Sequence, residues 1–189
     1  MRACVAAFAL LLCACDAPPP PVPVTNSGWC SRAPQPIGWQ RADAVGDVLV
    51  IEASIERYGG DAQANMPPVH NTVRIGISTR SRLNELILTL DDMRNDRMYR
   101  VSDAMNVAGY ATFETAGIIV LVAEDGQSSA RCFVHSDARM ASQCDFFLAL
   151  ESASARLSVP RRIVEDSLSS IIADVRPTAA YVADQCGSS

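Results

Sequence analysis

The chain contains no lysine. Its 189 residues include 16 arginines and two histidines as the only basic side chains. Without an amine side chain, P-loop phosphate binding, Schiff-base chemistry and kinase-type clamping of ATP are excluded. With 21 acidic residues the net charge is −5, which gives no electrostatic footprint for nucleic acid or for an anionic membrane. We therefore expect no nucleic-acid partner.

The start of the chain lacks an apolar run long enough to cross a bilayer, which takes about 20 residues. The run from Ala3 to Leu12 is shorter than that, follows the positive start Met1 and Arg2, and is followed by the small residue Ala14. This arrangement is typical of a cleaved export signal rather than of a membrane span.

Residues Leu12, Cys13, Ala14 and Cys15 resemble the lipobox of bacterial lipoproteins, with a cysteine where alanine or serine is usual before the last two residues. The resemblance implies diacylglyceryl transfer to the Cys15 thiol and cleavage before it, so that residues 1–14 are a lipoprotein signal peptide. Acyl chains on Cys15 would then hold the protein at a membrane of the cell envelope, facing the periplasm. The alternative is an ordinary cleaved leader of a soluble periplasmic protein.

The residue that follows, Asp16, resembles an inner-membrane retention signal of enterobacterial lipoproteins, and the choice between inner and outer membrane stays open. Residues 15–28 are predicted to be a lipidated tether, because the run Pro18–Pro21 favours extended polyproline II. Such a tether would reach up to about 40 Å from the lipid headgroups.

The cysteines predict two disulfides. Cys4 and Cys13 leave with the signal peptide and Cys15 carries lipid, so four of the seven cysteines remain in an oxidising compartment. If two strands turn about Ala138, Cys132 and Cys144 lie directly opposite each other and pair. Cys30 and Cys186 would then form the second bridge. A metal site from these thiols with His70 or His135 is not expected, because this part of the chain has no C-x-x-C pair.

Residues 29–189 are predicted to form one α+β domain, with a mainly antiparallel sheet and a C-terminal amphipathic helix packed on one face. Period-two patterns predict strands at residues 47–57, 73–77, 117–124, 129–135 and 142–150, with a turn at Asp125 and Gly126. Leu86, Leu88 and Leu90 suggest a further strand, and residues 58–72 a surface loop. Residues 101–114 are open to helix, strand or loop.

The predicted helix follows Pro160, with Ser158 as its cap and Pro160 in its first turn. Its apolar side contains Ile163, Val164, Leu168, Ile171, Ile172 and Val175. Pro177 would end or kink the helix, and a short helical tail would then bring Cys186 toward the N-terminal segment.

No group of residues makes a convincing catalytic site. His135, Ser136 and Asp137 are adjacent, and neighbours in a strand point to opposite faces, so they cannot form a relay among themselves. His70 is expected to be a solvated loop histidine. Asp91 and Asp92 lack the spacing of a calcium loop, and Glu151 has no paired carboxylate in the sequence. Trp29 and Trp39 are expected to pack around the Cys30 disulfide.

We therefore expect no cofactor and no metal, and a lipid-anchored, non-catalytic protein-binding module of an envelope or secretion assembly. The first alternative is a periplasmic immunity-type inhibitor of a toxin or hydrolase. The second is an envelope hydrolase that uses His135 or His70.

Overall fold

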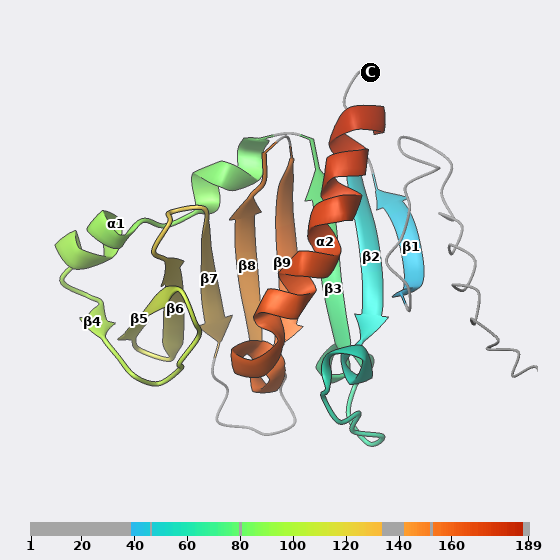
Figure 1. Cartoon of the computed structure of the whole chain (residues 1–189). Coiled ribbons are helices and arrows are strands. Elements are labelled where there is room, and N and C mark those ends of the chain that lie inside the picture. Colours follow the sequence, from blue (N-terminus) through green and yellow to red (C-terminus); the bar gives the residue numbers. More distant parts are fainter. Residues whose placement is uncertain (1–38, 46, 80, 134–141, 152, 187–189) are drawn as a thin grey trace, which may run out of the picture.

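A single antiparallel sheet crossed by one long helix dominates the computed structural model, which describes residues 39–45, 47–79, 81–133, 142–151 and 153–186. In these residues nine strands follow the order β1-β2-β3-β9-β8-β7-β6-β5-β4 across the sheet. Helix α2 (Val164–Cys186) lies obliquely over one face of the sheet and contacts β3 and β9 (Figure 1). The predicted α+β class, with a mainly antiparallel sheet and a C-terminal helix, is confirmed.

The strands are short and their neighbours pair antiparallel throughout. Their bounds are β1 Trp39–Val45, β2 Val48–Ser54, β3 Thr72–Ser78, β4 Arg100–Val101, β5 Tyr110–Thr115, β6 Ile118–Ala123, β7 Ser128–Phe133, β8 Gln143–Ala149 and β9 Ser154–Pro160. The helical elements before α2 are η1 Ile55–Tyr58, η2 Pro68–His70, η3 Ser81–Leu86, α1 Leu90–Asn95 and η4 Arg161–Ile163.

The main core lies between the sheet and α2. Alternate residues of the central strands are fully buried there, such as Ile51, Ile75 and Leu157, and they face the buried stripe of α2 that includes Leu168 and Ile171. Burying a side chain of this size contributes about 1.5 to 3 kcal/mol, so this layer carries most of the apolar stabilisation.

The opposite face of the sheet is covered only in part. Met93 of α1 packs on Phe113, Val120 and Val122 in a second, smaller cluster. Over β3, β8 and β9 this face carries charged side chains instead, and Arg156 pairs with Asp145 at 2.9 Å. Over its central strands the sheet therefore has one apolar face beneath α2 and one face that changes from apolar to charged.

The predicted register of the β7–β8 pair is confirmed. Cys132 lies opposite Cys144 and the two form a disulfide, while Ala130 lies opposite Phe146 in the same ladder. The predicted turn about Ala138 lies outside the described residues, as does Cys30 of the second predicted bridge. Cys186, its proposed partner, is the last residue of α2 and is buried.

The structure corrects two sequence-based expectations and adds one strand that was not predicted. Leu86, Leu88 and Leu90 do not form a strand: Leu86 ends η3 and Leu90 begins α1, whose capping box is made by Thr89 and Asp92. Ser158 does not cap the helix, because it belongs to β9 and its hydroxyl donates to Asp145. Strand β9 was not predicted, since its SARLSVP sequence has a single strong β former, a valine.

The structure also answers two questions that the sequence left open, namely the conformation of residues 101–114 and the effect of Pro177. The open segment 101–114 divides into the end of β4, an irregular stretch, and most of β5. Helix α2 begins at Val164 and continues through Pro177 to Cys186, so that proline does not end it. In the part of the chain that the structure describes, no helix has the length and apolar character needed to span a membrane.

Candidate binding groove

A groove runs along one flank of α2, between this helix and the ends of β5 to β8. Its larger part has a volume of about 530 Å³ and lies between Val107–Tyr110, the β6–β7 turn and α2. A second part of about 490 Å³ continues toward the C-terminal end of α2. Leu150 and Arg176 line both parts, so the two parts adjoin each other, and we call them together the α2 groove.

The α2 groove forms because only one side of the helix is buried against the sheet, and the apolar residues beside that side remain partly exposed. Leu168 packs into the core, whereas Ile172 is only half-buried and Ala173 and Ala180 are exposed. Together with Leu148 of β8 and Leu150, these side chains give the groove an apolar floor. The sequence pattern placed Ile172 on the apolar side of the helix, and the structure packs it against the main core with part of its side chain exposed in the groove.

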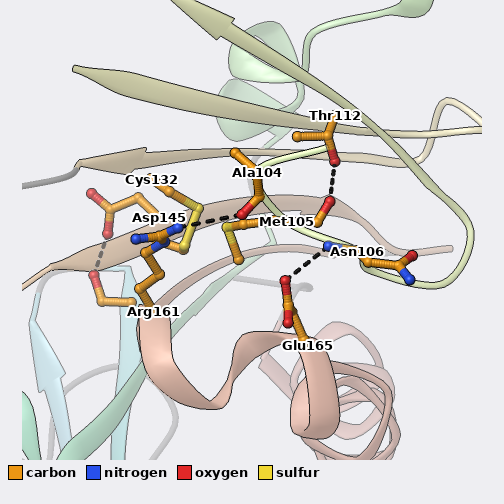
Figure 2. Close-up of a disulfide and its surroundings, with 10 residues drawn as sticks. Ala104, Met105, Asn106, Thr112, Cys132, Asp145, Arg161 and Glu165 are labelled. Carbon is orange, nitrogen blue, oxygen red and sulfur yellow. Dashed lines mark hydrogen bonds between the residues drawn. A yellow bond between two sulfur atoms is a disulfide. The ribbon is translucent and has the colours of Figure 1, made fainter. Parts of the chain in front are cut away.

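The wall opposite α2 is the irregular segment between β4 and β5. Met105 and Val107 are buried in the main core, so this segment is fixed at two points. Figure 2 shows Met105 between Thr112 above and Glu165 below, close to the disulfide. The Thr112 hydroxyl donates to the Met105 carbonyl at 2.8 Å, and the Asn106 N–H donates to a carboxylate oxygen of Glu165 at 2.8 Å (Figure 2).

The other flank of α2 is held by a charged cluster. The Arg57 guanidinium donates twice to Oδ2 of Asp174, at 2.9 and 2.8 Å, and the Tyr58 hydroxyl donates to the same oxygen at 3.1 Å. Burial and the negative charge of Asp174 raise the pKa of Tyr58 above its ordinary value. Burial alone lowers the pKa of Arg57, but its bonds to Asp174 outweigh that effect and raise it. The cluster ties η1 to the middle of α2.

Tyr110 is the half-buried polar group of the groove. Its hydroxyl and that of Ser128 lie 2.6 Å apart. The pKa of Tyr110 is raised, mainly by burial and to a smaller extent by the negative charge of Asp125. The hydrogen bond to Ser128 and the positive charge of Arg176 lower this pKa but do not cancel the increase. Tyr110 is therefore a neutral hydrogen-bonding group at neutral pH.

The residues that sequence analysis singled out do not gather at this groove, apart from Glu151 at its end. His70 was expected to be solvated, but it is buried with 7% exposure and its Nε2 has no hydrogen-bond partner among the described residues.

Asp92 caps α1, and the hydrogen bonds that it accepts from the hydroxyl and N–H of Thr89 lower its pKa. Trp39 is buried in the main core. Cys15, Trp29, Cys30 and His135 lie outside the described residues.

The groove itself was not predicted from the sequence. The only signal for it is the row of small residues Ala173, Ala179, Ala180 and Ala183 beside the apolar stripe of the helix. Within the described ranges, no group of three histidine, cysteine or acidic side chains is arranged to hold a metal ion.

Comparison of the chain with protein-family models, with curated proteins and with solved structures finds no match.

Proposed function

We propose that this chain is a lipid-anchored protein of the bacterial cell envelope that acts as a non-catalytic protein-binding module. In this proposal Cys15 carries the acyl chains, residues 15–28 form the tether, and a second disulfide joins Cys30 to Cys186. The partner is another envelope protein, which inserts a segment of its chain into the α2 groove.

The observation that carries the proposal is the α2 groove. It is apolar at its floor and charged at its rim, which is the composition of protein-binding surfaces with a buried centre. It follows α2 from Glu165 to Asp184, about 30 Å at 1.5 Å per residue, which suits a peptide segment better than a small molecule.

The walls of the groove support binding without a large rearrangement. One wall is fixed by Met105 and Val107 in the core, and the other by the bonds from Arg57 and Tyr58 to Asp174. A groove whose walls are already held in place loses little conformational entropy when a partner binds.

The test uses two neighbouring serines of α2. Ser169 lines the groove, whereas Ser170 is exposed outside its lining. Lipidated protein carrying an affinity tag is purified from detergent extract of its own cells, as wild type and as the variants Ser169→Trp and Ser170→Trp. We expect a partner that the wild type and Ser170→Trp recover equally and that Ser169→Trp loses. Equal recovery by both variants, or no partner above background with the wild type, would contradict the proposal.

A further inference from the structure

The rim of the α2 groove has a strongly uneven charge. The residues that line its two parts include five carboxylates, namely Glu124, Asp125, Glu151, Glu165 and Asp184, and one guanidinium, that of Arg176. All six residues are exposed.

The carboxylates surround an apolar floor rather than a flat, solvated surface. Leu148 and Leu168 are buried beneath the groove, and Leu150 and Ile172 are partly exposed within it. A partner that matches this surface must present apolar side chains to the floor and positive charge to the rim. Complementary charge of this kind raises the association rate and disfavours partners of the wrong sign.

Arg176 lies where the two parts of the groove meet. In the described part of the chain it forms no ion pair with a carboxylate. Two interpretations of this guanidinium make opposite predictions. In the first interpretation the partner segment is cationic, and Arg176 repels it weakly. In the second, Arg176 binds a carboxylate of the partner. The five surrounding carboxylates favour the first interpretation.

We propose that the α2 groove binds a cationic segment of the partner protein, in which lysine or arginine side chains alternate with apolar ones. This inference rests on the proposed function and adds the chemistry of the partner. The opposite face of the sheet, which carries Arg156, does not belong to this proposed binding site.

The first experiment selects ligands without any assumption about charge. A display library of random 12-residue peptides is selected for binding to the full chain and then counter-selected against the Ser169→Trp variant. We expect the peptides that depend on the groove to have a positive mean net charge and at least two large apolar residues. Groove-dependent peptides of neutral or negative charge would overturn the inference while leaving the proposed function intact. Failure to recover any groove-dependent peptide would contradict the proposed function itself.

The second experiment measures the dissociation constant of the tightest selected peptide at low salt. Glu124→Gln combined with Asp125→Asn should raise Kd about 5-fold, because each removed charge acts over roughly 8 Å of water. The amide introduced by Asp125→Asn still offers an oxygen to the Gln127 N–H, as the carboxylate of Asp125 does at 2.9 Å, so the turn is kept. The matched control, Glu85→Gln with Asp91→Asn, removes two exposed carboxylates outside the groove and should leave Kd unchanged.

Arg176→Gln decides between the two interpretations of that residue. The inference predicts that Kd falls by about 2-fold, because a like charge is removed. A rise in Kd of 10-fold or more would show that Arg176 anchors a carboxylate of the ligand, and would overturn the inference.

Discussion

Removing the Cys132–Cys144 disulfide should destabilise the domain by about 3 kcal/mol. The bridge closes a loop with a sequence separation of 12. The chain-entropy model assigns about 3 kcal/mol to a loop of this length, because the bridge restricts the unfolded chain. Both cysteines are fully buried in the main core. For a domain of this size the loss corresponds to a fall in Tm of about 6 to 12 °C.

The assay is urea unfolding of the chain in detergent solution, followed by tryptophan fluorescence and circular dichroism. The variant Cys132→Ala with Cys144→Ala is compared with its parent. Because both bridged cysteines are buried, we also expect the native disulfide to resist reduction by dithiothreitol until urea unfolds the chain. An unchanged unfolding midpoint, or alkylation of Cys132 without denaturant, would refute the argument.

Four further predictions concern single residues. Asp174→Asn should lower the free energy of unfolding by about 1 to 2 kcal/mol, measured in urea, because Arg57 and Tyr58 lose a charged acceptor. Thr89→Ala should cost about 1 kcal/mol by removing the N-cap of α1, seen as faster hydrogen exchange there. Because the pKa of Tyr110 is raised above its ordinary value of 10.0, Tyr110 contributes fully to stability below pH 10.0, and this contribution is lost as the pH rises above that value. Tyr110→Phe should therefore make the decrease of Tm at alkaline pH less steep. Cys15→Ser should release the protein from the membrane fraction, and mass spectrometry of the wild type should find acyl chains on Cys15.

Much of the fold could be predicted from the sequence where hydrophobic residues follow a simple period. The alternation in β2 and β3 and the apolar side of α2 were visible in this way, and the β7–β8 register followed from the spacing of Cys132 and Cys144. Strand β9 was missed because most of its side chains are small or charged, although it lies between β3 and β8 in the sheet. Its strand conformation is fixed by pairing with β3 and β8 rather than by its own propensity.

The segment around Leu86, Leu88 and Leu90 shows the opposite failure. Its alternating leucines imitate a strand, but Thr89 and Asp92 form a capping box and start α1 between them. Local hydrogen bonding at the helix start therefore outweighs an apolar pattern of only three residues.

The candidate site was beyond sequence-based prediction because it depends on contacts between distant elements. The α2 groove combines Tyr110 of β5, Asp125 of the β6–β7 turn and Leu150 after β8 with Ile172 and Arg176 from the helix. The pairing of Arg57 with Asp174 joins residues 117 positions apart in the sequence. Only the packing angle of α2 on the sheet reveals which of its flanks is open.

Crosslinking from the groove in living cells tests the central claim most directly. A photoreactive phenylalanine analogue is placed at Ala173, which lines the groove, or at Ser170, which does not, in the full 189-residue chain. Illumination should attach one envelope protein to position 173 and leave position 170 without that product. The same product from both positions, or none from position 173, would contradict the assignment of the groove as the binding site.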